Sequence, residues 1–200
     1  MMARHIEIPD DLGNRLLTQV ELQRARQQGS DALFQGQLRP AAVLMPLFVT
    51  EDGWNLLYTQ RTQKVDTHRG QVSFPGGAVD PGDESLSAAA CREAWEEVGI
   101  RPADIKVIGQ LSELNLVSYF RVTPVVGMIP WPYDLVLSVA EVETAFWVPL
   151  DWLADPENSY DELWMHAGQK QPVTFFKPYQ GQVIWGATAR MTVQLLEALK

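Results

Sequence analysis

The sequence predicts an α/β protein of the α+β type, in which helices cover both faces of a central mixed β-sheet. Strand-like runs outnumber helical runs along the chain. The two longest helical runs after the N-terminal one each follow a strand directly. An α/β/α sandwich is the economical way to bury such strands together with the apolar faces of the helices.

Length and composition set the expected domain organisation. The chain has 200 residues, of which 46% are hydrophobic and 20% charged. These values suit one globular domain with a sizeable core, with or without a terminal extension. We expect a helical extension over residues 1–40 and the main domain over residues 41–200.

The N-terminal helix is predicted from its start signal, its periodicity and its stop signal. Pro9-Asp10-Asp11 is expected to open the helix, which places acidic residues in its first turn. Leu12, Leu16 and Val20 then recur every four residues, and Gln28-Gly29 ends the helix. This amphipathic helix is expected to pack on the domain or to form a homodimer.

Most of the following segments are predicted strands and turns. The first strand, residues 41–50, contains Pro46, which favours an edge position or a bulge because proline lacks a backbone N–H. Glu51-Asp52-Gly53 predicts a hairpin turn. Further strands are expected at residues 54–60, 104–111, 119–129, 144–148, 163–166 and 172–176, with loops at residues 30–40, 61–70, 112–118 and 138–143.

Two helical segments complete the predicted fold. A short helical turn is expected at residues 150–154. A C-terminal helix should follow residues 183–186 and bury one apolar side. Its inward-facing residues are predicted to be Met191, Leu195, Leu196 and Leu199.

Charge, hydropathy and cysteine content exclude several classes of protein. The net charge is −9 and no basic run exceeds two residues, so we expect no nucleic-acid partner. No apolar run approaches the roughly 20 residues of a transmembrane helix, and the N-terminus has no apolar signal region. No membrane partner is therefore expected. The single cysteine, Cys91, excludes an internal disulfide and a zinc cluster, which favours a cytoplasmic location.

Residues 74–100 are the most informative segment, because they combine a glycine turn, an acidic loop and an acidic helix. On a helical wheel, one arc carries the apolar residues and the opposite arc carries Glu93, Glu96 and Glu97. The apolar arc, which should pack on the sheet, consists of Ala88, Cys91, Ala94, Trp95 and Val98. Ala89 and Ala90, which flank the glutamates, are expected to leave room for a ligand.

The three glutamates have two interpretations. They form like-charge pairs three and four residues apart, each of which costs a few tenths of a kcal/mol, about 0.2–0.5. Arg92, four residues before Glu96, relieves part of this repulsion. A solvated acidic face is one interpretation, and a divalent cation with oxygen ligands is the other. The adjoining glycine turn and alanines favour the cation.

Residues 61–70 form the densest cationic stretch of the chain, and they lie directly before the glycine turn. Arg61, Lys64, His68 and Arg69 are therefore candidate substrate-binding residues, on the hypothesis that the loop meets a phosphate group. His68 could also act as an acid or base. A loop exposed to solvent is the alternative interpretation.

The helix and its approach resemble the Nudix box, G-x5-E-x7-R-E-U-x-E-E-x-G-U, in which U is bulky and aliphatic. Glu84, Arg92-Glu93 and Glu96-Glu97 match in spacing, as does Gly99-Ile100. Two departures are six residues between Gly77 and Glu84, and Ala94 at a U position. The variant residues Gly76-Gly77-Ala78-Val79-Asp80 and Asp83 resemble the coenzyme A diphosphatase subfamily.

An upstream signature of that subfamily is also similar, L-L-T-x-R-S/A-x3-R-x3-G-x3-F-P-G-G. Residues 57–62 and Gly70-x3-Phe74-Pro75-Gly76-Gly77 match in spacing, whereas Asp66 stands where the signature has its second arginine. The resemblance extends over about residues 40–190. Its downstream parts are residues 122–127, Glu141-Val142, Phe146, Pro149-Leu150, Trp185-Gly186 and Thr188.

The resemblance implies a Mg²⁺- or Mn²⁺-dependent diphosphatase acting on a CoA-like small molecule. It implies that Arg92 orients the helix carboxylates, and that Glu141 is a metal ligand or the general base. The implied metal ligands are the Gly77 carbonyl, Glu93, Glu96, Glu97 and Glu141. The expected products from coenzyme A or acyl-CoA are 3′,5′-ADP and (acyl-)4′-phosphopantetheine. The alternatives are another diphosphate, such as ADP-ribose or a dinucleoside polyphosphate, and a non-catalytic nucleotide-binding module.

Overall fold

The main sheet is mixed, and β1 lies at its centre. The computed structural model describes residues 6–27, 38–62, 70–166 and 168–200. Within them the strand order is β3-β2-β1-β7-β5, with β4 paired to β1, β6 to β7 and β8 to β2. β1 runs parallel to β7, and the other pairs are antiparallel. The strands of this sheet are β1 (Arg39–Thr50), β2 (Gly53–Arg61), β3 (Val72–Ser73), β4 (Gly76–Ala78), β5 (Lys106–Gln110), β6 (Leu114–Asn115), β7 (Phe120–Met128) and β8 (Val142–Pro149).

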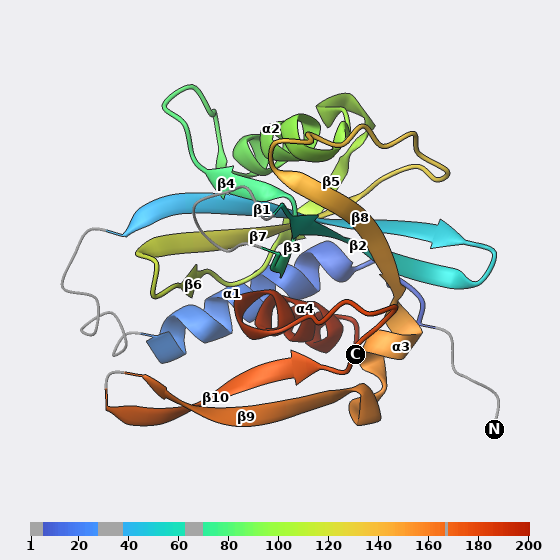
Figure 1. The fold of residues 1–200 in the computed structure, drawn as a ribbon. Coiled ribbons are helices and arrows are strands. Elements are labelled where there is room, and N and C mark those ends of the chain that lie inside the picture. The colour runs from blue at the N-terminus through green and yellow to red at the C-terminus, as the bar shows by residue number, and fades with distance from the viewer. Residues whose placement is uncertain (1–5, 28–37, 63–69, 167) are drawn as a thin grey trace.

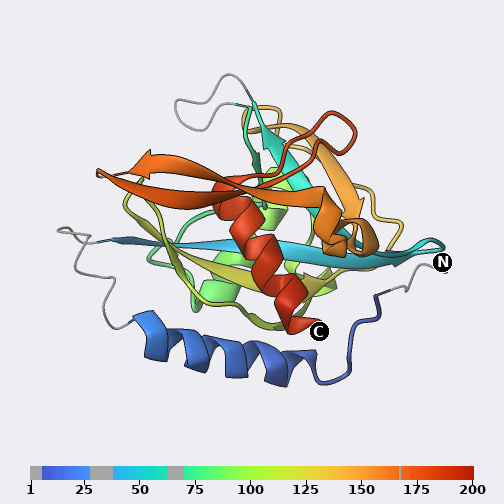
Figure 2. The same ribbon diagram turned by 90° about the horizontal axis from the view of Figure 1, so that it is seen from below.

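Helices cover both faces of the sheet, as the sequence predicts (Figure 1). One face carries α2, and the other carries α1, α4 and a separate β9–β10 hairpin; Figure 2 shows α1 and α4 on that side. The elements outside the main sheet are α1 (Leu12–Gln27), α2 (Leu86–Val98), α3 (Leu150–Ala154), α4 (Gly186–Ala198), the 3₁₀ turns Pro102–Asp104 and Pro156–Asn158, β9 (Ser159–His166) and β10 (Gln169–Phe176). The α/β/α sandwich is therefore confirmed.

The N-terminal helix packs on the domain. Leu12 and Leu16 of α1 are buried in the larger core cluster, which also contains Leu195 of α4. Gly109 of β5 lies against Leu16, where an added Cβ would be 3.0 Å from the leucine Cδ1. These contacts confirm the predicted inner face for Leu12 and Leu16. The domain boundary at residue 40 stays a prediction.

The expectation that Pro46 marks an edge strand is wrong, because β1 is internal. β4 pairs with residues 41–43 of β1, and β2 pairs with residues 47–50 on the same side. Pro46 falls in the gap between these two partners, so its missing N–H removes no hydrogen bond from either ladder. The expectation that residues 112–118 form only a loop misses the short strand β6 (Leu114–Asn115).

The helical wheel was right for Cys91, Ala94 and Val98 of α2, which are buried, but wrong at the edges of its apolar arc. Trp95, expected to be buried, is 49% exposed, whereas Glu97 is 2% exposed. Ala89 and Ala90 are fully buried in the cluster between α2 and the sheet, so they do not leave room for a ligand. Alanines on the sheet-facing side let the helix approach β1 closely, which a tryptophan at that contact would prevent. This close approach buries Glu97.

Among the described residues, no helix combines the length and the hydropathy needed to cross a membrane.

The C-terminal helix α4 buries Met191, Leu195 and Leu196, as predicted. The loop that contains Lys64, Asp66, His68 and Arg69 lies outside the described residues.

Candidate active site

Two adjacent glycines bring β4 close to both β1 and α2. A Cβ at Gly76 would lie 2.5 Å from the carbonyl oxygen of Ala42, and a Cβ at Gly77 would lie 2.6 Å from Glu93 Oε1. The backbone at Gly76 can therefore pair with β1, and the backbone at Gly77 meets a glutamate carboxylate. The glycine turn thus supplies the close approach that the predicted site needs.

The ends of α2 are fixed by two caps. The Ser85 hydroxyl accepts a hydrogen bond from the Ala88 N–H at 3.0 Å, which satisfies one of the free donors of the first turn. Gly99 ends the helix with a φ of 75°, a left-handed conformation that favours glycine. These caps fix the two ends of α2 and therefore the positions of the glutamates that the helix carries.

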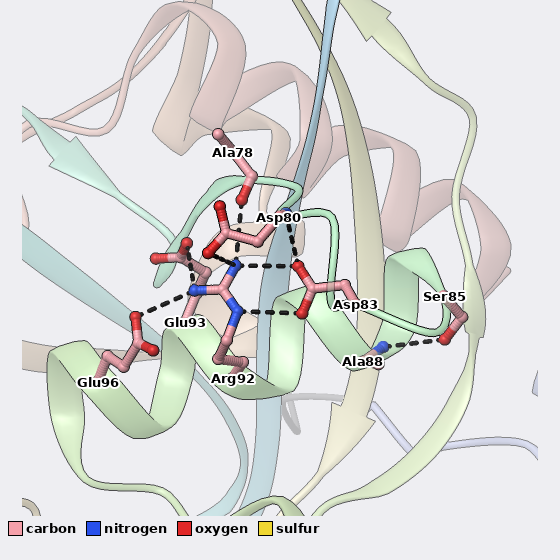
Figure 3. A network of polar contacts seen from close by, with 8 residues as sticks. All are labelled: Ala78, Asp80, Asp83, Ser85, Ala88, Arg92, Glu93 and Glu96. Atoms are coloured by element: carbon pink, nitrogen blue, oxygen red, sulfur yellow. Dashed lines mark hydrogen bonds and ion pairs between the residues drawn. The ribbon is translucent and has the colours of Figure 1, made fainter.

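Arg92 is the centre of a polar network that joins the acidic loop to α2 (Figure 3). Its Nε and Nη2 donate to the two carboxylate oxygens of Asp83 at 3.0 and 3.1 Å. Nη1 donates to Glu93 and Glu96 at 2.9 and 3.0 Å. Nη2 also donates to the Ala78 carbonyl at 3.1 Å. The guanidinium therefore holds residues 78–83 against the helix.

Sequence reasoning noted Asp83 only as a residue that resembles the subfamily, and it did not predict the bonds from Arg92 to Asp83. Its side chain is 6% exposed and also accepts a hydrogen bond from the Asp80 N–H at 2.8 Å. Hydrogen bonding from Arg92 lowers the pKa of the Asp83 carboxyl. Glu84, which matches the first glutamate of the Nudix box in its spacing from Arg92, is exposed. The signal was present, because five residues separate Gly77 from Asp83, as the box pattern requires.

Glu93, Glu96, Glu97 and Glu141 together are called the glutamate patch below. Within this patch, Glu97 is nearly inaccessible to solvent. Burial is the main reason that the pKa of Glu97 rises to about 8, and the nearby charges of Glu141 and Glu93 raise it further. Arg61 Nη1, 3.5 Å from Glu97 Oε1, and the Gly76 N–H act in the other direction. Among the described residues, the positive charge near this carboxyl does not offset the effect of its burial.

Glu93 connects the two halves of the patch. Burial raises the pKa of Glu93, the Arg92 guanidinium lowers it, and the charges of Glu96 and Glu141 raise it. Glu96 remains 52% exposed at its side chain. Glu141 lies on the loop before β8 and is close enough to influence both Glu93 and Glu97. The fold thus brings Glu141 to the helix glutamates.

The donor chemistry of the patch fits a hard divalent cation. Carboxylate oxygens are the ligands that Mg²⁺ and Mn²⁺ prefer. Burial raises the pKa of Glu93 and of Glu97, so a cation beside them would favour their ionised forms. In the described part of the chain, no three acidic, histidine or cysteine side chains converge as a ready-made metal cluster. Glu93 and Glu96 instead point to Arg92, and Glu97 lies nearest to Arg61.

Of the predicted substrate-binding residues, Arg61 reaches the glutamate patch. Lys64, His68 and Arg69 lie outside the described residues, so their roles stay predictions. Cys91 is buried, and burial raises the pKa of its thiol, which disfavours the reactive thiolate.

The site combines three features, which are a mixed sheet, an acidic helix that follows a glycine strand, and an arginine that anchors the acidic loop. This combination suits metal-assisted phosphate chemistry. The NUDIX domain model matches residues 38–167. The chain belongs to the Nudix hydrolase family, whose members are pyrophosphohydrolases. Nudix hydrolases generally use divalent metals such as Mg²⁺ or Mn²⁺.

Named relatives agree with this assignment. The chain is 41% identical over 162 residues to the uncharacterized Nudix hydrolase NudL of Photorhabdus laumondii, a match that covers 81% of this chain and 86% of the relative. It is also 41% identical over 182 residues to NudL of Cronobacter sakazakii, covering 91% and 92%. Among solved structures, a C. elegans Ap4A hydrolase binary complex has a TM-score of 0.48 and 26% identity, covering 56% of this chain and 80% of that chain.

Proposed function

We propose that this Nudix hydrolase cleaves the diphosphate of coenzyme A or an acyl-CoA. The products are 3′,5′-ADP and 4′-phosphopantetheine or its acyl form. The coarser activity, hydrolysis of nucleoside diphosphate derivatives, belongs to the family. The substrate proposal is supported by one observation above all. The strand that carries the upstream signature, β2, delivers Arg61 to within 3.5 Å of Glu97.

The glutamates and the glycine backbone are the proposed ligands of Mg²⁺ or Mn²⁺. Glu93, Glu96, Glu97, Glu141 and the Gly77 carbonyl would hold it. When bound, the ion supplies positive charge that neutralises diphosphate oxygens and acidifies a water molecule. Such charge is needed for the substrate as well, because a diphosphate would otherwise meet several carboxylates.

Each protein group has a separate proposed task. Arg61 turns from Glu97 to a phosphate oxygen, where its guanidinium can donate two hydrogen bonds. Arg92 keeps Glu93 and Glu96 in position through its bond to the acidic loop. Glu141 or a helix glutamate takes the proton of the attacking water. The water oxygen bonds to phosphorus as the bridging P–O bond breaks.

Product identification tests the substrate. Purified protein is incubated with coenzyme A, acetyl-CoA, ADP-ribose or diadenosine tetraphosphate, each with Mg²⁺, Mn²⁺ or EDTA, and the products are separated by mass spectrometry. We expect 3′,5′-ADP from the first two substrates and none with EDTA. Turnover of ADP-ribose or diadenosine tetraphosphate without 3′,5′-ADP from coenzyme A would overturn the substrate proposal.

A pair of neighbouring glutamates separates catalysis from binding. Glu141→Gln should lose most of the turnover, whereas Glu143→Gln, an exposed acid two residues away, should retain it. A protein that binds the nucleotide but turns over none of the four substrates would be a non-catalytic module.

Location and assembly are further proposals. We place the protein in the cytoplasm, because its one cysteine is buried and free and it therefore needs no oxidising compartment. The substrate is a small molecule, with no nucleic-acid or membrane partner. The predicted homodimer is tested by light scattering of the full chain after gel filtration, which should give twice the 22.5 kDa monomer mass.

A further inference from the structure

Glu141 differs from the other acidic groups of the patch because a loop holds it. The Ser138 N–H donates to the Glu97 carbonyl at 2.9 Å, which ties the loop to the last turn of α2. The N–H groups of Glu141 and Val142 both donate to the Ser138 carbonyl, at 2.9 and 2.8 Å. These bonds form a tight turn and join it to α2. None of them joins the turn to β2.

A register shift between β2 and β8 brings Glu141 opposite the end of β2. Gln60 pairs with Thr144, but Arg61 pairs with Val142, so Glu143 is an extra residue on β8. Without this bulge, the residue opposite Thr62 would be Val142. With it, the Thr62 N–H donates to the Glu141 carbonyl at 2.9 Å. Bulges often re-aim side chains next to active sites.

Thr62 makes a second contact to the same loop. Its hydroxyl donates to the Ala140 carbonyl at 3.3 Å, and the residue is 6% exposed. Thr62, the residue after Arg61, therefore donates hydrogen bonds to two successive carbonyls of the loop, those of Ala140 and Glu141. The bond from the Ser138 N–H to the Glu97 carbonyl keeps the same loop beside the last turn of α2, the helix that carries Glu93 and Glu97.

We propose that Thr62 is a positioning residue of the reaction, whose hydroxyl fixes the loop at Ala140 and thereby sets Glu141 against Glu93 and Glu97. The inference rests on the proposed function only in assigning Glu141 to the hydrolysis. The local claim, that the hydroxyl orders residues 138–142, stands on the hydrogen bonds alone.

A double-mutant cycle tests the catalytic part. Thr62→Val keeps the backbone bond to Glu141 and the side-chain shape, but it removes the hydroxyl that bonds the Ala140 carbonyl. We expect kcat to fall about 5- to 10-fold with unchanged KM, the effect of one hydrogen bond that orients a reacting group. Thr62→Ser should restore kcat. In a Glu141→Gln background, Thr62→Val should have no further effect, because the group that it positions is gone.

Thr59→Val is the matched control. Thr59 lies on β2, three residues before Thr62, and is fully buried. Its hydroxyl bonds the Ser73 carbonyl at 3.3 Å and the Ser73 hydroxyl at 3.2 Å rather than the loop. It should lose stability like Thr62→Val, measured by denaturation, but keep kcat. A fall in kcat that is equal for both variants, or one that adds fully to Glu141→Gln, would overturn the proposal.

Hydrogen exchange of the metal-free protein supplies a readout independent of activity. Amides of residues 138–142 should exchange faster in Thr62→Val than in wild type, and at the wild-type rate in Thr59→Val. Unchanged exchange in Thr62→Val would overturn the proposal even if coenzyme A is a substrate. Faster exchange in a protein that hydrolyses none of the tested diphosphates would uphold the local claim and overturn the proposed function instead.

Discussion

The two ends of the glutamate patch treat negative charge in opposite ways. At the Arg92 end, one guanidinium bonds Asp83, Glu93 and Glu96 over distances of 2.9 to 3.1 Å. At the Glu97 end, a carboxyl that is 2% exposed lies 3.5 Å from the Arg61 guanidinium. The pKa of Asp83 is lowered, and that of Glu97 is raised to about 8.

The difference distinguishes an anchored end from a strained end. At the Arg92 end, the guanidinium satisfies the Asp83 carboxylate and holds Glu93 and Glu96, both proposed metal ligands, in place. The Glu97 end carries the cost of burying a carboxyl whose compensation is incomplete. Strongly perturbed carboxyls of this kind mark functional sites. Each prediction below tests whether a residue belongs to one end or the other.

Glu97→Gln should have the largest effect on activity. Removing the charge from the proposed ligand should lower kcat about 1000-fold, which corresponds to about 4 kcal/mol in the barrier. Steady-state rates with saturating Mn²⁺ measure the loss, and circular dichroism verifies that the variant is folded. A variant that keeps a substantial share of the wild-type rate would assign Glu97 to the scaffold.

The same carboxyl should make the metal-free protein less stable as the pH rises. The folded state holds the Glu97 proton up to about pH 8, whereas the unfolded chain releases it near 4.5. The stabilising contribution is therefore complete below pH 4.5 and is lost as the pH rises through 8. Integration gives a loss of about 3 kcal/mol between pH 5 and pH 8.

Urea denaturation in EDTA measures this slope. Because other groups also titrate, the informative quantity is the difference between wild type and Glu97→Gln, which should lose the contribution. Adding Mn²⁺ should reduce the slope of the wild type, since a cation bound to the folded state stabilises the carboxylate form. Parallel slopes in the two proteins would contradict the assigned burial cost.

Two neighbouring glycines should separate an effect on stability from an effect on activity. Gly76→Ala would press a Cβ against the Ala42 carbonyl at 2.5 Å and the Val43 Cα at 2.6 Å. Because this is backbone of the central strand, we expect a loss of about 1–3 kcal/mol of stability.

Gly77→Ala should act on activity instead. Its Cβ would meet Glu93 Oε1 at 2.6 Å, and a flexible side-chain end can move aside. We therefore expect near wild-type unfolding for this variant, with a lower kcat because Glu93 is displaced. Equal losses of stability in the two alanine variants would show that Gly77 serves the fold as Gly76 does.

The sequence predicted the elements better than it predicted how they pack. Strand periodicity and turn residues are local signals, so β1, β2 and α4 were found within a few residues of their ends. The rotation of α2 depends on the shape of the sheet beneath it, which a wheel does not contain. Trp95 was therefore expected inside, and the burial of Glu97 was not foreseen.

The site was predictable where its residues are close in sequence. The glutamates of α2 and the glycine turn were identified as one group, although their catalytic roles stay predictions. The way Glu141 is held depends on a bond from Thr62 and on a strand bulge. These are long-range features with no sequence signal of their own. Glu141 was found only through the family resemblance.

Asp83 and Glu84 are adjacent acids with different contacts, because Arg92 bonds Asp83 while Glu84 is exposed. Substituting each in turn tests the Arg92 end with the smallest expected effect. Asp83→Asn keeps an oxygen for one bond from Arg92 but loses the charge and the second acceptor. We expect it to lower the free energy of unfolding by about 1–2 kcal/mol, the usual value for a hydrogen bond to a charged group that is only partly replaced.

Glu84→Gln should leave the free energy of unfolding unchanged, since the Glu84 side chain is exposed and Arg92 bonds its neighbour. Chemical denaturation of both variants at pH 7 measures the difference. If Glu84→Gln were the more damaging change, the acid that anchors Arg92 would be the one at six-residue spacing from Gly77, and the network around Asp83 would be incidental. The opposite result would fix Asp83 as the acid that anchors Arg92.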